Sequence, residues 1–310
     1  MNERQVSTGV HKVKVPADRA GQRLDNFLSG YLGGVPRSMI YRLVRTGQVR
    51  VNGKRAKPMK KLTAGDEVRI PPVASKPAAP RAIAEEWVDR LRAAIIELNQ
   101  DFVVIDKPAG LAIHGGSGLS FGLMDIAARI DDNWRPVHRL DRPTSGLLIL
   151  ARHHQALVGL QKAFAQRRVE KRYLALMCGR LAQDRISVDR RLKKVRDGSG
   201  QHRVIVAEDG QSAVTHFRVL ERLPAFTYVE VEIETGRTHQ IRAHAAELGH
   251  ALAGDDRYGS QAGPGGLKRL FLHAHLLRLD WPDERVFNAP LPTDLAVVLD
   301  TLRSPTDPLR

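Results

Sequence analysis

The stretch VHRLDRPTSGLLIL, residues 137–150, passes from dense charge to an unbroken apolar run. Its apolar end, GLLIL, has the composition of a strand that is buried on both faces. Asp141 stands just before that run, between Arg139 and Arg142 and close to His138. Nearby positive charge favours the ionised form of a carboxyl group, so we expect a carboxylate at the entrance to the core. A charge in such a place needs a partner and often has a function, although a surface salt bridge is the plainer interpretation.

The chain as a whole carries a large excess of positive charge. Its 310 residues include 49 Lys and Arg against 34 Asp and Glu, which gives a formal net charge of +15. The length allows a sizeable core and favours two domains. A solvated surface needs no such excess of cations, so we expect a polyanionic partner, most commonly a nucleic acid. An anionic membrane surface is the competing interpretation, but no lipidation signal or basic amphipathic helix supports it.

Cysteine content and hydropathy favour the reducing cytoplasm. Cys178 is the single cysteine, which excludes an internal disulfide and a cysteine-rich zinc site, and its apolar surroundings indicate a packed thiol. The first ten residues lack the apolar core of a secretory signal. No window holds the eighteen or so apolar residues of a membrane helix. We therefore expect a cytoplasmic monomer with no membrane contact and no metal.

A proline-rich stretch divides the chain. PPVASKPAAPRAIA, residues 71–84, contains four prolines among small residues and shows neither helical nor strand periodicity. This composition is typical of a semi-rigid linker. We expect a small domain over residues 12–72, a linker over 73–86 and a larger domain over 87–310.

The small domain is expected to combine two helices with short strands. RLDNFLSGYL (23–32) and RSMIYRLVRTG (37–47) place apolar residues at helical spacing, and the second ends at a glycine. QVRVNGKRA (48–56) alternates two valines before Asn-Gly, the dipeptide that favours a tight hairpin turn. AGDEVRI (64–70) supplies a further strand.

Residues 37–61 contain nine Lys and Arg and no Asp or Glu. A solvated helix face normally mixes both signs, so contacts to phosphates explain this stretch better. Residues 22–70, with the helix, the VNG hairpin and the closing GDEV step, resemble the S4 RNA-binding module, which implies binding to structured RNA. The candidate RNA-binding residues of this domain are Arg37, Arg42, Arg45, Arg50, Lys54, Lys57, Lys60 and Lys61.

The larger domain is expected to be α+β. Two apolar runs flank an Asn-Gln-Asp turn within 94–110, and Thr and Val alternate through 212–236 as in paired, half-buried strands. Helical spacing marks residues 155–169 and 238–249. Because the strands come in runs and do not alternate strictly with helices, a doubly wound parallel sheet is disfavoured.

Three patterns in this domain carry little chemistry. HGGSG at 114–118 lacks the Gly-Lys-Ser/Thr ending of a phosphate-binding loop, so a flexible loop is the better interpretation. Ser120 matches the letters of a nucleophile elbow, but no apolar strand leads into it. Four histidines lack metal-ligand spacing, and structural or RNA-facing roles are expected for them: His239, His244, His273 and His275.

HRLDRPTSG resembles the catalytic motif of the RluA-type pseudouridine synthases. The family's other landmarks follow in its order, and the resemblance covers about residues 15–290. It implies a catalytic domain built on a mainly antiparallel mixed sheet. HGGSGLSFG further resembles the RluC type, which modifies large-subunit ribosomal RNA. This resemblance implies that the partner is large-subunit ribosomal RNA or the pre-ribosomal large subunit. Two departures are Pro143, where Asp is common, and Ala251, where Pro is frequent.

The resemblance also assigns roles. Family members break the bond between uracil N1 and ribose C1′, turn the base and rejoin it through C5. Asp141 is implied as the catalytic carboxylate and Tyr173 as the tyrosine that stacks on the uracil. Arg242 is our choice for the ion-pair partner of Asp141, with Arg237 in reserve. Arg139, and less strongly His138, would fill the RNA stack that the extruded uridine leaves. An isomerisation within one nucleotide implies no cofactor.

Alternative functions remain at this point. A pseudouridine synthase acting on transfer RNA or another RNA would share these motifs. A non-catalytic ribosome-assembly factor would keep the basic surface but lose the carboxylate. A glycosidase or esterase would need paired carboxylates or a Ser-His-Asp set.

Overall fold

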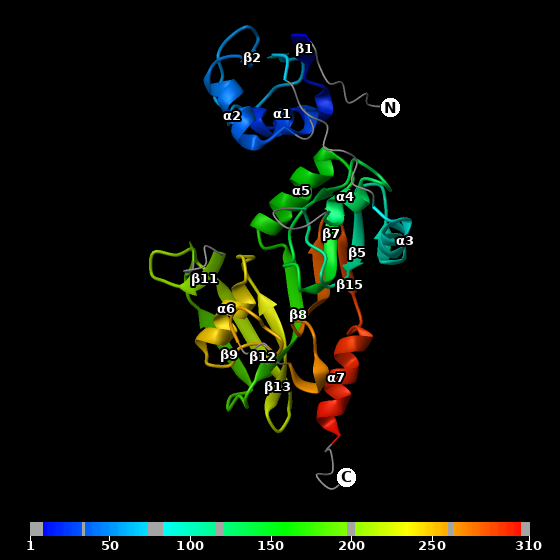
Figure 1. Ribbon diagram of the computed structural model, residues 1–310, viewed down its shortest axis with the longest axis vertical. Helices are drawn as coiled ribbons and strands as arrows, with labels where there is room; N and C mark the ends of the chain where they lie inside the picture. Colours follow the sequence, from blue (N-terminus) through cyan, green and yellow to red (C-terminus); the bar gives the residue numbers. More distant parts are fainter. Residues whose placement is uncertain are drawn as a thin grey trace. The chain divides into compact units, whose positions relative to one another are not determined.

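The computed structural model describes residues 9–32, 35–73, 83–115, 121–196, 202–259 and 263–304 (Figure 1). The chain divides into two compact units, residues 1–82 and 83–310. This division falls within the stretch that the sequence assigns to a linker. Residues 74–82 of that stretch lie outside the described part of the chain, and so does Ser120.

The N-terminal unit packs two helices against a small sheet. Its three strands are antiparallel in the order β1-β3-β2, and one apolar cluster lies between helices and strands. The predicted helices and strands are confirmed at nearly the expected positions. The elements are β1 (His11–Lys14), η1 (Ala17–Arg19), α1 (Leu24–Leu32), α2 (Arg37–Arg45), β2 (Arg50–Val51) and β3 (Glu67–Ile70).

The Asn52-Gly53 dipeptide forms the tight turn that the sequence predicts. Both residues have positive φ, +50° and +74°, and the backbone groups of Val51 and Lys54 exchange two hydrogen bonds of 3.0 Å across the turn. The pairing across the turn stops at Val51 and Lys54, and the partner of β2 in the sheet is β3. Asn52 also fixes that pairing, since its side chain donates to Asp66 and accepts from the Glu67 backbone.

The C-terminal unit contains a ten-stranded sheet with helices on both faces. Its elements are α3 (Glu85–Ala93), β4 (Ile95–Leu98), β5 (Phe102–Lys107), α4 (Leu123–Ala127), β6 (Arg135–Pro136), β7 (Ser145–Ala151), α5 (His154–Ala165), β8 (Val169–Cys178), β9 (Arg185–Asp189), β10 (Leu192–Arg196), β11 (His202–Val206), β12 (Val214–Arg222), β13 (Phe226–Ile233), α6 (Gln240–Glu247), η2 (Pro264–Gly266), β14 (Leu272–Asp280), β15 (Glu284–Asn288) and α7 (Thr293–Arg303). The predicted α+β class with a mainly antiparallel mixed sheet is confirmed.

One strand joins the two halves of this sheet. The order β4-β5-β7-β14-β8-β13-β12-β9 places β14 between a half that comes early in the chain and a half that comes later. All strand pairs are antiparallel except β7 with β14, which is parallel and short. The loop that carries Asp141 leads into β7, in the first half, whereas Tyr173 lies on β8 and Arg242 on α6, both in the second. The predicted site residues therefore meet where β14 connects the halves.

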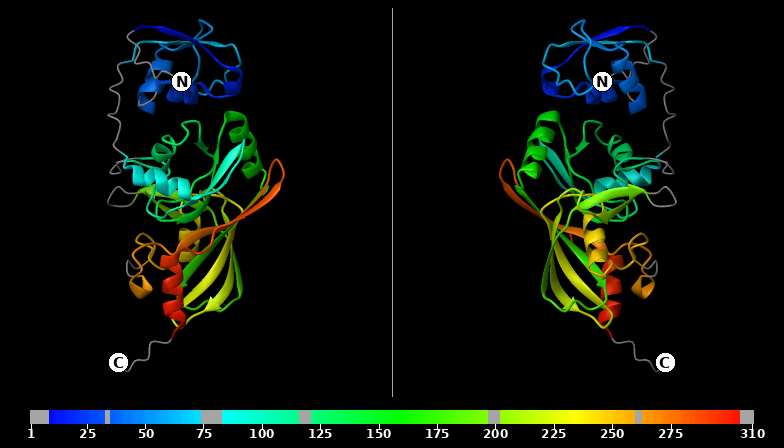
Figure 2. Two further views of the ribbon diagram at one scale, coloured as in Figure 1. Left: turned by 90° about the vertical axis from the view of Figure 1, so that its right-hand side faces the viewer. Right: turned by 90° about the vertical axis from the view of Figure 1, so that its left-hand side faces the viewer.

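Burial on both faces explains the continuous apolar run of β7. All seven of its residues are buried. Leu147 and Ile149 pack against α5 through Leu160, while Leu148 and Leu150 lie in the cluster that α3 and α4 cover. Figure 2 shows α7 alongside the long strands of the sheet, where its leucines pack on Phe271.

Gly146 allows β7 and β14 to meet. Its φ is +110°, a conformation that side chains with a Cβ rarely adopt. A Cβ there would lie 2.2 Å from the carbonyl oxygen and 2.6 Å from the nitrogen of Ala274. The glycine of the PTSG step is therefore required by the close approach of two backbones.

Gly146→Ala is expected to lower the free energy of unfolding by about 3 kcal/mol, because it adds backbone strain and a clash between strands that cannot move apart. Thermal or denaturant unfolding of the full chain measures this loss. Gly236→Ala is the control, since a Cβ at Gly236 meets nothing within 4 Å. Equal stability of both variants would contradict this account of the β7–β14 junction.

Candidate active site

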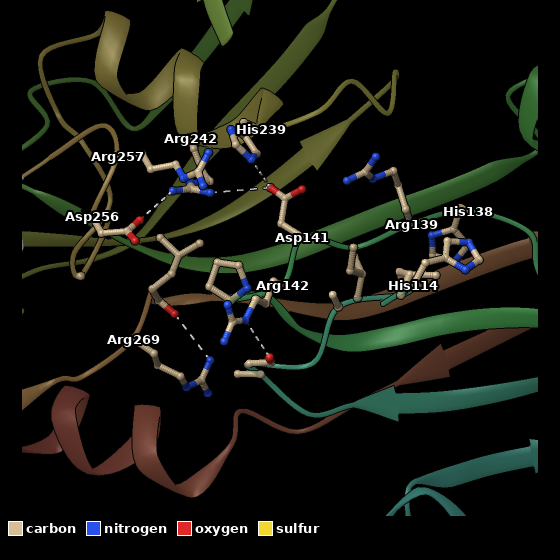
Figure 3. Close-up of a pocket in the computed structure, with 18 of the residues that line it drawn as sticks. His114, His138, Arg139, Asp141, Arg142, His239, Arg242, Asp256, Arg257 and Arg269 are labelled. Carbon is tan, nitrogen blue, oxygen red and sulfur yellow. Dashed lines mark hydrogen bonds and ion pairs between the residues drawn. The ribbon is translucent and has the colours of Figure 1, made fainter. Parts of the chain in front are cut away.

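Asp141 lies at the wall of a large pocket in the C-terminal unit (Figure 3). It belongs to the loop between β6 and β7, and its side chain is 14% exposed. The pocket has a volume of about 1230 Å³ and is formed by that loop, residues 109–114, α6 and the segments around 254–257 and 268–270. A largely buried carboxylate facing an open pocket is available to a bound ligand.

Two groups distant in sequence hold Asp141. His239 Nε2 is 3.8 Å and Arg242 Nη1 3.9 Å from the same carboxylate oxygen, Oδ2 (Figure 3). No hydrogen bond or ion pair from the described residues reaches Oδ1. Oδ2 therefore lies near a cation and an imidazole, and Oδ1 is left open to a ligand.

The two arginines that flank Asp141 in the sequence do not pair with it in the structure. Arg142 Nε donates to the carbonyl oxygen of Gly110 at 3.0 Å, and Arg139 is exposed at the pocket wall. Neither forms an ion pair with Asp141 within the described part of the chain. The positive charge beside the Asp141 carboxylate therefore comes from Arg242 and not from its two sequence neighbours.

Arg242 is anchored by a second carboxylate. It is buried at 2% exposure, and its Nε and Nη2 donate to the two oxygens of the fully buried Asp255 at 2.8 and 2.7 Å. Burial acts to lower the pKa of Arg242, but the bonds from Asp255 outweigh it and raise the pKa. Burial acts to raise the pKa of Asp255, and the bonds from Arg242 lower it overall. Both groups are therefore charged, and Arg242 brings a fixed cation to Asp141.

Tyr173 and Asp141 share a smaller cavity of about 60 Å³ beside the large pocket. Tyr173 is 6% exposed, and burial, followed by the charge of Asp141, raises the pKa of its phenol. Ile233, Ile241 and Leu272 give this cavity an apolar lining. A flat, partly apolar ligand group beside the carboxylate suits such a cavity.

Arg237 and His138 lie close to Asp141 but have other partners. Arg237 borders the smaller cavity, and its Nε donates to the carbonyl oxygen of Ser212 at 3.0 Å. His138 Nε2 accepts the backbone N–H of Ile149 at 3.1 Å, and its ring stacks on Phe164 with centroids 4.8 Å apart. His138 therefore fastens the Asp141 loop to β7.

His138 is neutral in the folded protein. Burial, and then the ammonium group of Lys171, lower the pKa of His138 to about 3. Its contact with Ile149 agrees, because a nitrogen that accepts a hydrogen bond cannot carry a proton.

Replacing His138 with glutamine is expected to make stability less sensitive to acid. The pKa of His138 lies below the unfolded value of about 6.5, so the unfolded chain binds the proton first. The contribution of neutral His138 to the free energy of unfolding is complete above pH 6.5 and is lost as the pH falls toward 3. The loss reaches about 2 kcal/mol at pH 5. Denaturant unfolding at pH 7 and pH 5 compares wild type with His138→Gln. An equal loss in both proteins would contradict a neutral His138.

Lys107 is a buried cation that sequence reasoning did not single out. It is fully buried, and its Nζ donates to the carbonyl oxygens of Pro108 and Leu111 at 2.8 and 2.9 Å. Burial lowers the pKa of Lys107 to about 7, while Asp141 acts to raise it. Its place at the end of β5, in an Asp-Lys-Pro step, is the only local signal. The side chain closes the loop that forms one wall of the pocket.

The candidate RNA-binding residues of the N-terminal unit are all exposed. None of these eight forms an ion pair with another described residue. Arg42, Arg45 and Lys57 border a pocket of about 580 Å³, together with the exposed Tyr41. A concave surface with unpaired cations and an aromatic ring suits a phosphate chain with an adjacent base.

Among the described residues, no group of three or more His, Cys, Asp or Glu is placed to hold a metal ion. No helix in the described part of the chain is both long and apolar enough to cross a membrane.

Comparisons with known proteins fit this geometry. The family model of RNA pseudouridylate synthases matches residues 101–247, and the model of the S4 domain matches residues 22–68. The chain is 43% identical over 308 residues to the ribosomal large subunit pseudouridine synthase C of Salmonella typhi, covering 94% of this chain and 96% of that protein. The enzyme of the same name from Escherichia coli K12 has the same identity and coverage.

Solved structures agree with the sequence matches. Human RNA pseudouridylate synthase domain containing 4 superposes with a TM-score of 0.59 at 25% identity, over 70% of this chain and 95% of that one. A second human protein, RNA pseudouridylate synthase domain containing 1, superposes with a TM-score of 0.56 at 26% identity, over 70% of this chain and 96% of that one. The chain belongs to the RNA pseudouridylate synthase family, in the branch of the ribosomal large subunit synthases C that begin with an S4 domain.

Proposed function

We propose that this chain converts uridines of large-subunit ribosomal RNA to pseudouridine, with Asp141 as the carboxylate that acts on the ribose. The observation that carries the proposal is the state of Asp141: Oδ2 lies near His239 and Arg242, while Oδ1 is left to the pocket. Similarity to the large-subunit synthases C supports the choice of RNA.

Asp141 meets the electronic demand of the reaction. Breaking the N1–C1′ bond leaves an electron-poor sugar carbon and an anionic uracil. A carboxylate near the sugar serves this step as nucleophile at C1′, as base at C2′ or as electrostatic stabiliser. The fixed charge of Arg242 attracts the carboxylate of Asp141 and helps to orient it. A cavity closed to water would retain the detached base until C5 bonds to C1′.

Tyr173 is proposed to contact the uracil. It lies beside Asp141 in the smaller cavity, whose aliphatic lining comes from β13, α6 and β14. An aromatic ring stacks on the flat face of a base. The raised pKa of Tyr173 keeps its phenol protonated, so any help in removing the C5 proton has to pass through a partner group.

The rims of the large pocket are proposed to bind the RNA backbone. Arg139 is exposed there and is free to fill the stack that the extruded uridine leaves. His138 is a structural neighbour of that contact, and Arg237 a reserve cation at the smaller cavity. Apart from Arg242 beside Asp141, the other cations of the pocket lining are Arg142, Arg257, Lys268 and Arg269.

Asp141→Asn is expected to abolish tritium release from ribosomal RNA labelled at uracil C5, with a loss of at least about a hundredfold, because the amide carries no negative charge. RNA binding should persist. Asp283→Asn, an exposed change in the turn between β14 and β15, serves as control. Full release by Asp141→Asn would refute the role of Asp141, and release of free uracil would indicate a glycosidase.

The N-terminal unit is proposed to grip the RNA through its exposed cations. Removing residues 1–72 should leave a folded catalytic unit, because each unit has its own apolar core. Binding should become weaker, and the slope of log affinity against log salt should become shallower by about 0.7 to 0.9 for each phosphate that this unit neutralises in the full chain. Filter binding at several salt concentrations measures both. An unchanged slope would refute RNA binding by this unit.

The tritium-release assay also distinguishes two alternative functions. Activity on transfer RNA, with none on naked large-subunit RNA or on pre-ribosomal particles, would change the substrate. Binding without isomerisation would indicate an assembly factor. We further propose a cytoplasmic monomer that needs no cofactor, which sedimentation and activity in the presence of a chelator would test.

A further inference from the structure

Tyr258 connects the basic hairpin β10–β11 to both partners of Asp141. Its Oη accepts the backbone N–H of Val204 on β11 at 2.9 Å and lies 3.1 Å from Nδ1 of His239. Two guanidinium groups, those of Arg203 and Arg242, lie over its ring, each 5.2 Å from the centroid. One side chain therefore contacts an outer element, the imidazole and the buried cation.

The hydrogen bonds of Tyr258 favour one position for the imidazole proton of His239. The phenol has a single proton, and its oxygen already accepts from Val204. Its O–H is therefore available to donate to Nδ1 of His239, which leaves the imidazole proton on Nε2. That nitrogen faces Asp141 Oδ2 at 3.8 Å. The opposite tautomer would turn a lone pair toward the carboxylate and is disfavoured.

The charges around His239 agree with a neutral ring. Burial lowers the pKa of His239, and although Asp141 and the more distant Asp255 act to raise it, Arg242 and Arg257 act together with burial. A neutral imidazole has one proton, and its position is set by the hydrogen bond at the other nitrogen.

The backbone of His239 is held in a costly conformation. Its φ and ψ are +53° and +22°, in the left-handed region, at the residue that precedes α6. This conformation costs of the order of a hydrogen bond for a residue with a Cβ, so neighbouring contacts have to maintain it. Ala243 donates its backbone N–H to the His239 carbonyl oxygen at 2.9 Å, and Tyr258 holds the ring.

The hairpin holds Tyr258 in turn. Leu192 and Val204 of the hairpin pack on Ala243 of α6, so its position relative to the helix is fixed by apolar contacts. The backbone N–H of Val204, which donates to Tyr258, therefore belongs to a strand that is packed against α6.

We propose that Tyr258 is a positioning residue for the isomerisation: it fixes the tautomer of His239 so that an N–H group faces Oδ2 of Asp141 and presents Oδ1 to the ribose. This inference rests on the proposed role of Asp141. Tyr258 touches neither substrate nor reacting atoms, and it acts through His239.

Tyr258→Phe is the direct test, because it removes only the hydroxyl group and keeps the ring beside Arg203 and Arg242. We expect the single-turnover rate on the ribosomal RNA substrate at saturating enzyme to fall about tenfold, the effect of one hydrogen bond. The enzyme concentration at half-saturation should change less than about twofold, since no RNA contact is removed. Tyr228→Phe is the matched control, a buried phenol in the cluster that α7 covers.

A double-mutant cycle tests the route through His239. Tyr258→Phe combined with His239→Ala should be no slower than His239→Ala alone, because the tyrosine then has no imidazole to orient. Additive losses would overturn the proposal, as would a wild-type rate for Tyr258→Phe or a change confined to half-saturation.

A spectroscopic measurement separates this proposal from the role of Asp141. With ¹⁵N-labelled histidine, and His239→Gln to assign the signal, wild-type His239 should show its proton on Nε2. Tyr258→Phe should shift the signal toward a mixture of tautomers. A wild-type proton on Nδ1 would overturn the inference without any assay of activity. Full activity of Asp141→Asn with the predicted tautomer would refute only the proposed catalytic role.

Discussion

The buried ion pair of Arg242 and Asp255 is the interaction on which the proposed active site depends. Removing one partner of such a pair leaves an uncompensated charge, which costs about 3–5 kcal/mol. Asp255 also accepts the backbone N–H groups of Arg257 and Tyr258, so the pair fixes the segment after α6 together with the helix. Because Asp255 holds its guanidinium group through two hydrogen bonds, Arg242 presents a well-positioned cation to Asp141.

The sequence predicts much of the fold because the decisive signals are local. The apolar run of β7, the turn at Asn52-Gly53 and the helical spacing before Gly249 need only neighbouring residues to be recognised. Gly249 has φ +78°, the conformation that ends α6. The N-terminal cations are likewise visible as a run of one sign. These features are set by periodicity and backbone preference, which the chain expresses over a few residues.

The environment of Asp141 is less predictable, because it depends on pairing between distant strands. Arg139 and Arg142 are its neighbours in sequence, yet the loop turns them away. His239 and Arg242 follow about a hundred residues later and arrive through the sheet topology. The sequence offers both Arg237 and Arg242 as partners for Asp141, and nothing in it marks Asp255 as the stronger partner of Arg242. Tyr258 gives no local signal, because its role depends on contacts with three separate elements.

The position of β14 also has a consequence for the order of folding. The strands on either side of it, β7 and β8, are complete long before residues 272–280 are synthesised. This late strand joins β7, which follows the loop of Asp141, to β8 in the half-sheet on which α6 packs with His239 and Arg242. Contacts between such distant segments form slowly, since a long loop has to close first. A nascent chain therefore carries its RNA-binding N-terminal unit well before it has a working catalytic centre.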